Sequence, residues 1–321
     1  MKKIFVFLFF VVFLAFISFV TANIYSKISN NKTSIVSPLP DFLTIFLNRQ
    51  VSTLNIWVPS LDNKVSTKLQ APNVSAWSVL IYDLTSKQVL YSKNPKQKLP
   101  MASLTKIMTA IVALENKKKN DQYKVSKDDL VGEDSMGLDV GEMLSLSDLL
   151  YGMMLHSGND VAETLANNFP KGRNAFIKAM NSKVKTLGLL DTNFTNPTGL
   201  EGDGKQYTTV YDLLVMTQYA LSNFPLFDQI VSTFDYNIPS SSTHKAFYLE
   251  NETNLLTSYP GVKGVKTGYT PEAGLCLVTY LDYNGHKIIA VILGSDDRRG
   301  EMIELLDYSL ETLGITPPHH G

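Results

Sequence analysis

Strand-like patterns lie near both ends of the chain, and helical patterns fill the middle. Alternating apolar side chains indicate strands at residues 77–82, 88–91, 262–266, 275–282 and 286–293. Asn284-Gly285 separates the last two and is a strong signal for a two-residue hairpin. Helical spacing occurs at residues 103–115, 147–156, 160–169, 174–187 and 305–313. We therefore predict an α/β (α+β) fold in which both ends build one antiparallel sheet, covered by helices, with a helical subdomain from the middle.

The first 22 residues are expected to enter a membrane. Lys2 and Lys3 precede an apolar run over residues 4–22 that is interrupted only by two hydroxyl residues. The run is longer than the roughly 7–15 residues of a signal-peptide core and close to the roughly 20 that span a bilayer, which favours an uncleaved anchor. Val20-Thr21-Ala22 has the small-residue spacing of a cleavage site, so removal as a signal peptide stays an alternative.

The remaining chain is predicted to form one folded domain between two irregular segments. Residues 23–72 are rich in Asn, Ser, Thr and Lys without a sustained period, which indicates a linker. The folded domain is expected to span residues 73–314. Residues 315–321 are predicted to be a flexible tail, and His319 and His320 there have no third ligand nearby to suggest a metal site.

Charge and cysteine content restrict the partners. The 29 basic residues nearly balance the 30 acidic ones, so the overall charge does not indicate nucleic acid as a partner. The single cysteine, Cys276, excludes an internal disulfide, and its apolar strand-like surroundings predict a buried core residue. The substrate must therefore be inferred from the motifs.

The first motif is Ser103-Leu104-Thr105-Lys106 at the start of an amphipathic helical pattern. Ser103 would lie at the helix N-terminus, with Lys106 one turn further on the same face. A hydroxyl becomes a strong nucleophile when a base takes its proton, and a lysine serves as that base when burial or a second cation lowers its pKa. Taken alone, S-x-x-K more often marks an N-capping serine beside an exposed lysine.

Two further polar motifs follow. Ser157-Gly158-Asn159 lies in a break between two helical segments, where Ser157 could relay a proton and the Asn159 amide could hold a substrate backbone. Alone, this tripeptide more often marks an interhelical turn that caps the next helix. Lys266-Thr267-Gly268 is expected at the end of a strand, where a cation, a hydroxyl and a glycine suit a carboxylate beside an open backbone edge. Its simpler interpretation is a solvated lysine.

Together, S-x-x-K, S-x-N and K-T-G in this order form a set close to that of penicillin-binding proteins and class A β-lactamases. From about residue 76 to 313 the sequence resembles the low-molecular-mass D-alanyl-D-alanine carboxypeptidases, a family of penicillin-binding serine peptidases. The similarity also includes longer phrases at residues 100–109, 180–189 and 192–200. The resemblance implies a penicillin-binding protein/β-lactamase-like fold and no cofactor.

The resemblance also implies roles for individual residues. Ser103 would be the acylated nucleophile, Lys106 its general base, and Ser157 the proton relay. Lys266 would bind the terminal carboxylate of the substrate, and the backbone N–H groups of Ser103 and Tyr269 would form the oxyanion hole. The other residues expected at the substrate are Asn159, Thr267, Gly268 and, as an assistant to Lys266, Arg298.

The implied substrate is a peptidoglycan stem peptide ending in D-Ala-D-Ala, with β-lactams as covalent inhibitors. The catalytic domain would lie on the outer face of the bacterial cytoplasmic membrane, held by residues 4–22 or secreted after cleavage. Many relatives continue into a β-rich domain and a C-terminal amphipathic helix, whereas this sequence stops at Gly321. That departure favours the N-terminal segment as the anchor.

Three alternatives stay open. A D,D-endopeptidase that cuts cross-links would use the same residues. A class A β-lactamase needs a glutamate to activate water, and Glu163 with Asn167 reproduces its Glu-to-Asn spacing, but both lie inside a helical pattern close to Ser157. A catalytically silent peptidoglycan-binding module would not need all of these side chains.

Overall fold

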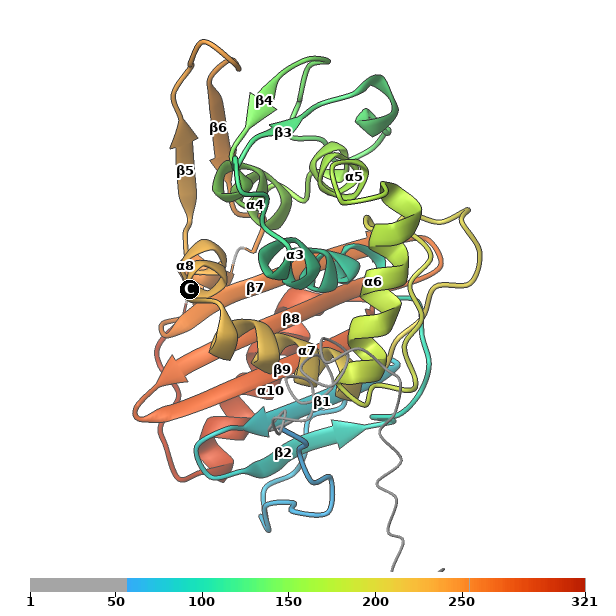
Figure 1. Ribbon diagram of the computed structural model, residues 1–321. Coiled ribbons are helices and arrows are strands. Elements are labelled where there is room, and N and C mark those ends of the chain that lie inside the picture. Colours follow the sequence, from blue (N-terminus) through green and yellow to red (C-terminus); the bar gives the residue numbers. More distant parts are fainter. Residues whose placement is uncertain (1–56, 254, 321) are drawn as a thin grey trace, which may run out of the picture. The chain divides into compact units, whose positions relative to one another are not determined.

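The computed structural model describes residues 57–253 and 255–320 (Figure 1). The described residues belong to one compact unit, Ile56–Gly321. The predicted membrane segment and most of the predicted linker lie outside the described residues.

A five-stranded antiparallel sheet is the centre of this unit, in the order β2-β1-β9-β8-β7. The strands are β1 (Ser78–Asp83), β2 (Gln88–Lys93), β7 (Val262–Thr270), β8 (Gly274–Tyr283) and β9 (His286–Ser295). Both ends of the chain therefore build one sheet, as predicted. Asn284 and Gly285 have φ angles of 49° and 83°, which suit the tight turn expected between β8 and β9.

The alternation within the strands divides the core into two layers. Along β9, Ile289, Val291 and Leu293 belong to the core on the side of helix α7 (Val210–Asn223). The intervening β9 residues belong to a second core with helix α10 (Arg298–Thr312), which covers the opposite face (Figure 1). Because both faces are covered, β9 is apolar at every position from Ile288 to Leu293.

Helices and two small hairpins make up the rest of the unit, partly beyond β7 and partly across a face of the sheet (Figure 1). The helices are η1 (Ala102–Thr105), α3 (Lys106–Glu115), η2 (Lys127–Asp129), α4 (Leu146–Leu155), α5 (Asn159–Asn167), α6 (Arg173–Thr186), α8 (Pro225–Val231) and α9 (Leu255–Ser258). The hairpins pair β3 (Tyr123–Lys124) with β4 (Met143–Leu144), and β5 (Asp235–Ile238) with β6 (Phe247–Glu250). The structure thus confirms helices covering an antiparallel sheet.

Two boundaries differ from the sequence prediction. β7 continues to Thr270, so Lys266-Thr267-Gly268 lies inside the strand and not at its end. The strand continues because this segment pairs residue by residue with β8. Helix α10 begins at Arg298 and not near residue 305, because the Asp297 side chain caps it by accepting from the Gly300 N–H.

The folded part also begins before residue 73. Val65 N–H donates to the Val89 carbonyl over 3.1 Å, so residues expected in the linker lie along β2. The Trp57 ring makes an edge contact with Tyr82, with centroids 5.3 Å apart. At the other end, His320 lies 2.9 Å from the Asp307 carboxylate, which holds the end of the described tail against α10. Val65 and Trp57, two apolar residues in a mostly polar segment, thus belong to the folded domain.

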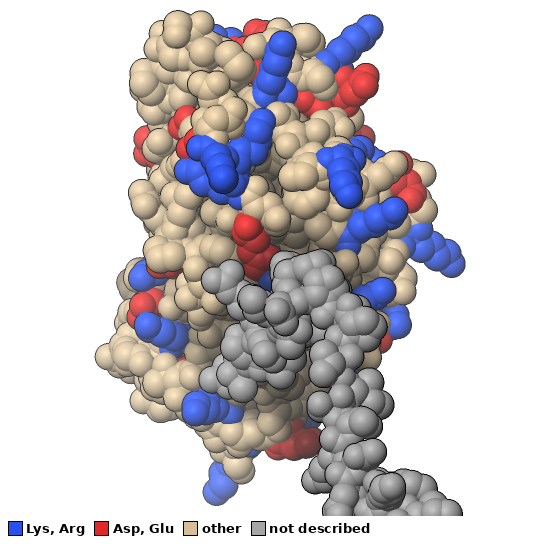
Figure 2. Space-filling view, viewed as in Figure 1, with Lys and Arg blue, Asp and Glu red and all other residues tan. Residues whose placement is uncertain are grey.

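The surface charge and the length of the helices were compared with what nucleic acids and membranes require. On the described part of the face in Figure 2, basic and acidic side chains are dispersed among uncharged ones and do not form one patch. Among the helices between residues 57 and 320, none combines the length and apolar character that crossing a bilayer requires.

Candidate active site

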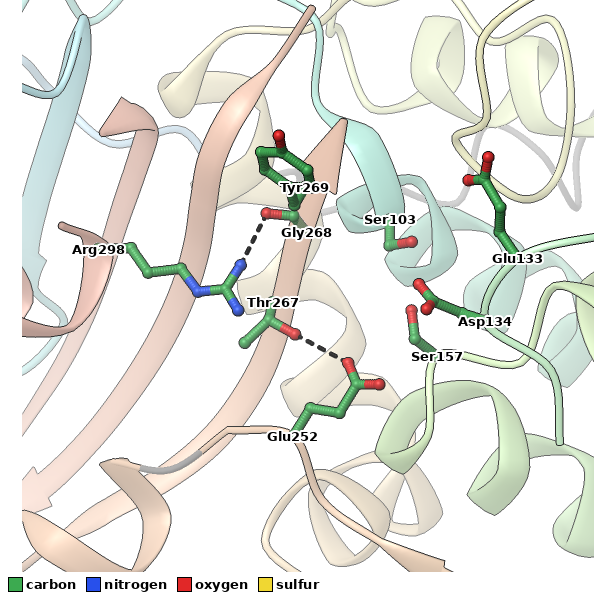
Figure 3. Close-up of a pocket in the computed structure, with 9 residues that line it drawn as sticks. All are labelled: Ser103, Glu133, Asp134, Ser157, Glu252, Thr267, Gly268, Tyr269 and Arg298. Atoms are coloured by element: carbon green, nitrogen blue, oxygen red, sulfur yellow. Dashed lines mark hydrogen bonds between the residues drawn. The ribbon is translucent and has the colours of Figure 1, made fainter. Parts of the chain in front are cut away.

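The three motifs meet at a pocket of about 460 Å³ beside the edge strand β7 (Figure 3). Ser103 and Ser157 point into it from the helical side, whereas Thr267 and Arg298 approach from the sheet. The residues that line it are Ser103, Glu133, Asp134, Ser157, Glu252, Thr267, Gly268, Tyr269 and Arg298. Lys106, Asn159 and Lys266 are buried.

Ser103 lies in the short 3-10 turn η1, directly before α3. The preceding residue, Ala102, has a φ of 48°, a left-handed conformation that is uncommon outside glycine. Gly199 packs so closely against this turn that a Cβ there would overlap the Ala102 carbonyl. The serine is therefore held by a strained turn between two neighbouring segments.

Lys106 is the first residue of α3, and its amine has three hydrogen-bond partners. Nζ lies 2.8 Å from Ser103 Oγ, 2.7 Å from Asn159 Oδ1 and 2.8 Å from the Thr198 carbonyl. Its side chain is fully buried. The S-x-x-K spacing thus brings the hydroxyl and the amine into hydrogen-bond contact, as expected.

Burial lowers the pKa of Lys106 well below its usual value, because the charged amine loses its hydration. The nearby Lys266 cation lowers the pKa further, while Asp134, Glu252 and Asp160 act in the opposite direction. An uncharged amine at this position has a lone pair that can accept the Ser103 proton.

The second motif lies between α4 and α5. Ser157 has a φ of 56°, and this turn places its hydroxyl on the pocket. Asn159 opens α5, and its Oδ1 accepts from Lys106. Among the described residues, its buried Nδ2 has no hydrogen-bond partner. A buried donor without a partner is uncommon, so Asn159 has hydrogen-bonding capacity that its protein neighbours do not use.

A carboxylate behind the second motif fixes the loop that forms one wall of the pocket. Asp160 accepts hydrogen bonds from the backbone N–H groups of Met136, Gly137 and Leu138, each 3.0 Å long. Asn159 N–H also donates to the Asp134 carbonyl over 2.7 Å. These bonds hold Glu133 and Asp134 opposite β7.

The third motif provides the cationic side of the site. Lys266 is 1% exposed, and its pKa is lowered to about 8, chiefly by burial and to a smaller extent by the nearby Arg298 cation. Its Nζ lies 3.8 Å from Glu252 Oε2, which opposes that shift together with Asp134. Thr267 Oγ1 donates to the same carboxylate oxygen over 3.3 Å (Figure 3).

Arg298 reaches the site from the first turn of α10. Its Nη1 donates to the Gly268 carbonyl over 2.9 Å (Figure 3). Tyr269, the next residue of β7, has an exposed side chain at the pocket. The structure therefore brings Arg298 to the same pocket as the three motifs.

Sequence reasoning missed three contributors. Thr198 acts through its backbone carbonyl, which every residue has, so only the similar phrase at residues 192–200 could have indicated it. Glu252 and Asp134 come from irregular segments where an acidic residue is common. Glu163 and Asn167, the apparent lactamase pair, do not line the pocket; their side chains bond to Arg173 and Asp129.

This arrangement can carry out acyl transfer. A hydroxyl bonded to a buried amine, a second hydroxyl, and a lysine on an edge strand define a serine enzyme of the penicillin-binding type. Residues 65–297 match the D-alanyl-D-alanine carboxypeptidase family, peptidase S11, and the chain belongs to this family.

Individual relatives agree with this assignment. D-alanyl-D-alanine carboxypeptidase DacF of Bacillus subtilis is 33% identical over 75% of this chain, which spans 64% of that relative's length. A D-alanyl-D-alanine endopeptidase of Pseudomonas aeruginosa is 32% identical over 79% of this chain and 82% of its own.

Solved structures confirm the penicillin-binding fold. The Streptomyces K15 DD-transpeptidase has a TM-score of 0.71 at 30% identity, covering 76% of this chain and 100% of its own. Penicillin-binding protein D2 of Listeria monocytogenes, in its ampicillin-bound form, has a TM-score of 0.65 at 28% identity, covering 74% of this chain and 100% of its own.

Proposed function

We propose that this chain is a serine D-Ala-D-Ala carboxypeptidase that removes the terminal D-alanine from peptidoglycan stem pentapeptides. The observation that carries the proposal is the 2.8 Å contact between Lys106 Nζ and Ser103 Oγ beside the buried cation of Lys266. An activated serine next to a carboxylate-binding group suits a peptide bond adjacent to a free C-terminus.

In the first chemical step, neutral Lys106 takes the Ser103 proton while Oγ bonds to the carbonyl carbon of the penultimate D-alanine. The N–H groups of Ser103 and Tyr269 stabilise the oxyanion. Ser157 passes a proton to the departing amine of the terminal D-alanine. Water then attacks the ester on Ser103, with proton transfer back to the serine oxygen.

The other residues position the substrate. The free Nδ2 of Asn159 is suited to donate to a backbone carbonyl of the stem peptide. Lys266, Thr267 and Arg298 would bind the terminal carboxylate. The peptide can add as a further strand along the open edge of β7, beside Gly268.

A D,D-endopeptidase is the second candidate, because relatives with that name are as similar to this chain as the carboxypeptidases. A lactamase reaction finds less support, since Glu163 is bonded to Arg173 over 2.7 Å and does not line the pocket.

The deciding experiment compares three substrates: a pentapeptide, its C-terminal amide and a cross-linked dimer. We expect the wild-type enzyme to prefer the pentapeptide over the amide by about 10²-fold or more in kcat/KM, on the usual scale for losing one partner of a buried charge pair. In Lys266→Ala, both should be cleaved with similar, low efficiency. A wild-type preference for the dimer would instead establish the endopeptidase.

For localisation, we propose the outer face of the cytoplasmic membrane, with residues 4–22 as an uncleaved anchor. The apolar length of that segment supports this proposal. Full-length mass and retention in the membrane fraction after a high-salt wash are the expected results. A mature N-terminus at Asn23 would show that the segment is a signal peptide.

A further inference from the structure

Glu252 occupies a distinctive position on the pocket. It lies between β6 and α9, and its carboxylate contacts both Thr267 and Lys266 (Figure 3). Its backbone is fixed, since its N–H donates to the Leu155 carbonyl over 3.1 Å. The neighbouring Asn251 is buried, and its Oδ1 accepts from Thr253 N–H over 2.9 Å. The carboxylate is therefore presented to the site by a well-anchored segment.

This contact uses the groups that the proposed reaction needs for its substrate. A threonine hydroxyl has one proton to donate, and here it is directed to Glu252 Oε2 over 3.3 Å. The Lys266 amine is 3.8 Å from the same oxygen. A substrate carboxylate that bound Thr267 and Lys266 would have to replace Glu252 as the acceptor of the Thr267 hydrogen bond. It would also lie next to the negative charge of Glu252.

We propose that Glu252 is a specificity-determining residue that competes with the substrate carboxylate for Thr267 and Lys266. The proposal rests on the proposed function, in which those two residues bind the terminal carboxylate. Glu252 keeps the cation paired while the pocket is empty. It then yields the Thr267 hydroxyl when an anionic ligand enters, and its side chain, 38% exposed, has room to turn toward solvent.

Two opposing effects of Glu252 have to be separated. Its charge repels a substrate carboxylate, which weakens binding, but it also favours the protonated form of Lys266, which strengthens binding. The other titratable groups around Lys266 are Lys106, Arg298 and Asp134. Acylation is therefore measured at about pH 6.5, below the wild-type Lys266 pKa of about 8, where the protonation of Lys266 is less sensitive to the loss of Glu252 than at higher pH.

The test uses benzylpenicillin, which has a free carboxylate, and its neutral methyl ester. Acylation rates of Ser103 are followed by intact mass at pH 6.5 in wild type and Glu252→Gln, which keeps the shape and removes the charge. We expect Glu252→Gln to accelerate acylation by the acid about three- to tenfold, a range that allows for solvent screening, and to leave the ester within about twofold. High salt should reduce the difference.

Glu133→Gln is the matched control. It removes a negative charge from the same pocket, but in the described residues no contact joins Glu133 to Thr267 or Lys266. We expect it to change the acid-to-ester ratio by less than about twofold, because an exposed charge without contact is well screened. Circular dichroism and Tm would establish that both variants are folded.

An equal change of both rates in Glu252→Gln would overturn the proposal, because Glu252 would then act on Ser103 or Lys106. Slower acylation by the acid would also overturn it. Release of D-alanine from a pentapeptide is measured in parallel. If wild type is acylated by penicillin but releases none, the carboxypeptidase proposal fails, while the acid-to-ester comparison still decides the role of Glu252.

Discussion

Gly268 of β7 lies directly against the backbone of Ser103. A methyl group at Gly268 would be 3.1 Å from the Ser103 nitrogen and 3.2 Å from the Ala102 side chain. A glycine is thus required here because β7 lies so close to η1, the turn that carries Ser103. No unusual backbone angle requires it.

Gly268→Ala should therefore impair acylation more than folding. The new methyl group would push η1 away from β7 and misplace Ser103, and a displacement of about 1 Å can cost about 10²-fold in rate. Penicillin acylation and urea unfolding would be measured together. The exposed Gly132, whose Cβ would meet nothing within 4 Å, provides the matched control as Gly132→Ala. Unchanged acylation in Gly268→Ala would contradict this account of the motif.

Ser103→Ala should abolish covalent labelling by β-lactams. Wild type should acquire one adduct per chain, located in the peptide that contains Ser103, because its Oγ is the hydroxyl bonded to Lys106. Intact mass followed by peptide mapping would measure this. Labelling of Ser103→Ala at the wild-type rate would show that another residue is the nucleophile.

Lys106→Arg should lose acylation while the protein stays folded. Arginine keeps a positive charge but does not deprotonate near neutral pH, so the base is removed. The expected loss is about 10²–10⁴-fold, the range for general-base catalysis. Lys98→Arg, at a surface ion pair with Asp191, is the control. Normal acylation in Lys106→Arg would require a different base.

The pH profile of kcat/KM should be bell-shaped for a substrate with a free carboxylate. Activity should rise with pH as Lys106 loses its proton, since burial and Lys266 lower its pKa. It should fall above about pH 8 as Lys266 loses the charge that binds the carboxylate. For the amide substrate, this falling limb should flatten. Identical falling limbs for both substrates would assign the upper pKa to another group.

Asp83→Ala should destabilise the protein without changing the chemistry of the site. Asp83 is fully buried, and its carboxylate accepts from Thr85 N–H, Ser86 N–H and His286. Burial alone would raise its pKa, but bonds from Ser86, His286 and Thr85 lower it. Its contribution is thus present at neutral pH and is lost as pH falls through the lowered pKa.

We expect a loss of about 2–3 kcal/mol in the free energy of unfolding at pH 7, the range for hydrogen bonds to a buried charge. Denaturant unfolding would measure it, with the exposed Asp139→Ala as a control that should change far less. A difference that persists undiminished at pH 2 would contradict the role of the ionised carboxylate.

The sequence predicted the elements whose residues have a regular period. The apolar β9 and the Asn284-Gly285 turn are both present as expected. Helix α7 was not predicted, because Val210 to Thr217 is buried without interruption and lacks the polar stripe of an amphipathic helix. The predicted end of β7 was too early because Lys266 and Thr267 are polar, and a central strand rarely contains such residues. β7 is an edge strand beside a pocket, where polar side chains can be accommodated.

Within the site, the sequence predicted the side chains but not their surroundings. Ser103 and Lys106 could be paired because their spacing is local. The Asp134 and Glu252 carboxylates reach the pocket from irregular segments, so no period indicates them. Whether Asn159 Nδ2 has a hydrogen-bond partner depends on all the atoms around it, so the sequence could not indicate that it lacks one.

The pairing of β1 with β9 sets a condition on when the chain can fold. Asp83 and His286, joined by a hydrogen bond, are 203 residues apart in sequence. Because β9 lies between β1 and β8, the sheet cannot close until the last strand has been synthesised. Contacts at such separation form slowly, since the loop between them must be ordered first. A nascent chain that lacks residues 286–295 therefore has no strand to join β1 and β2 to β8, and the sheet is completed only after synthesis reaches residue 295.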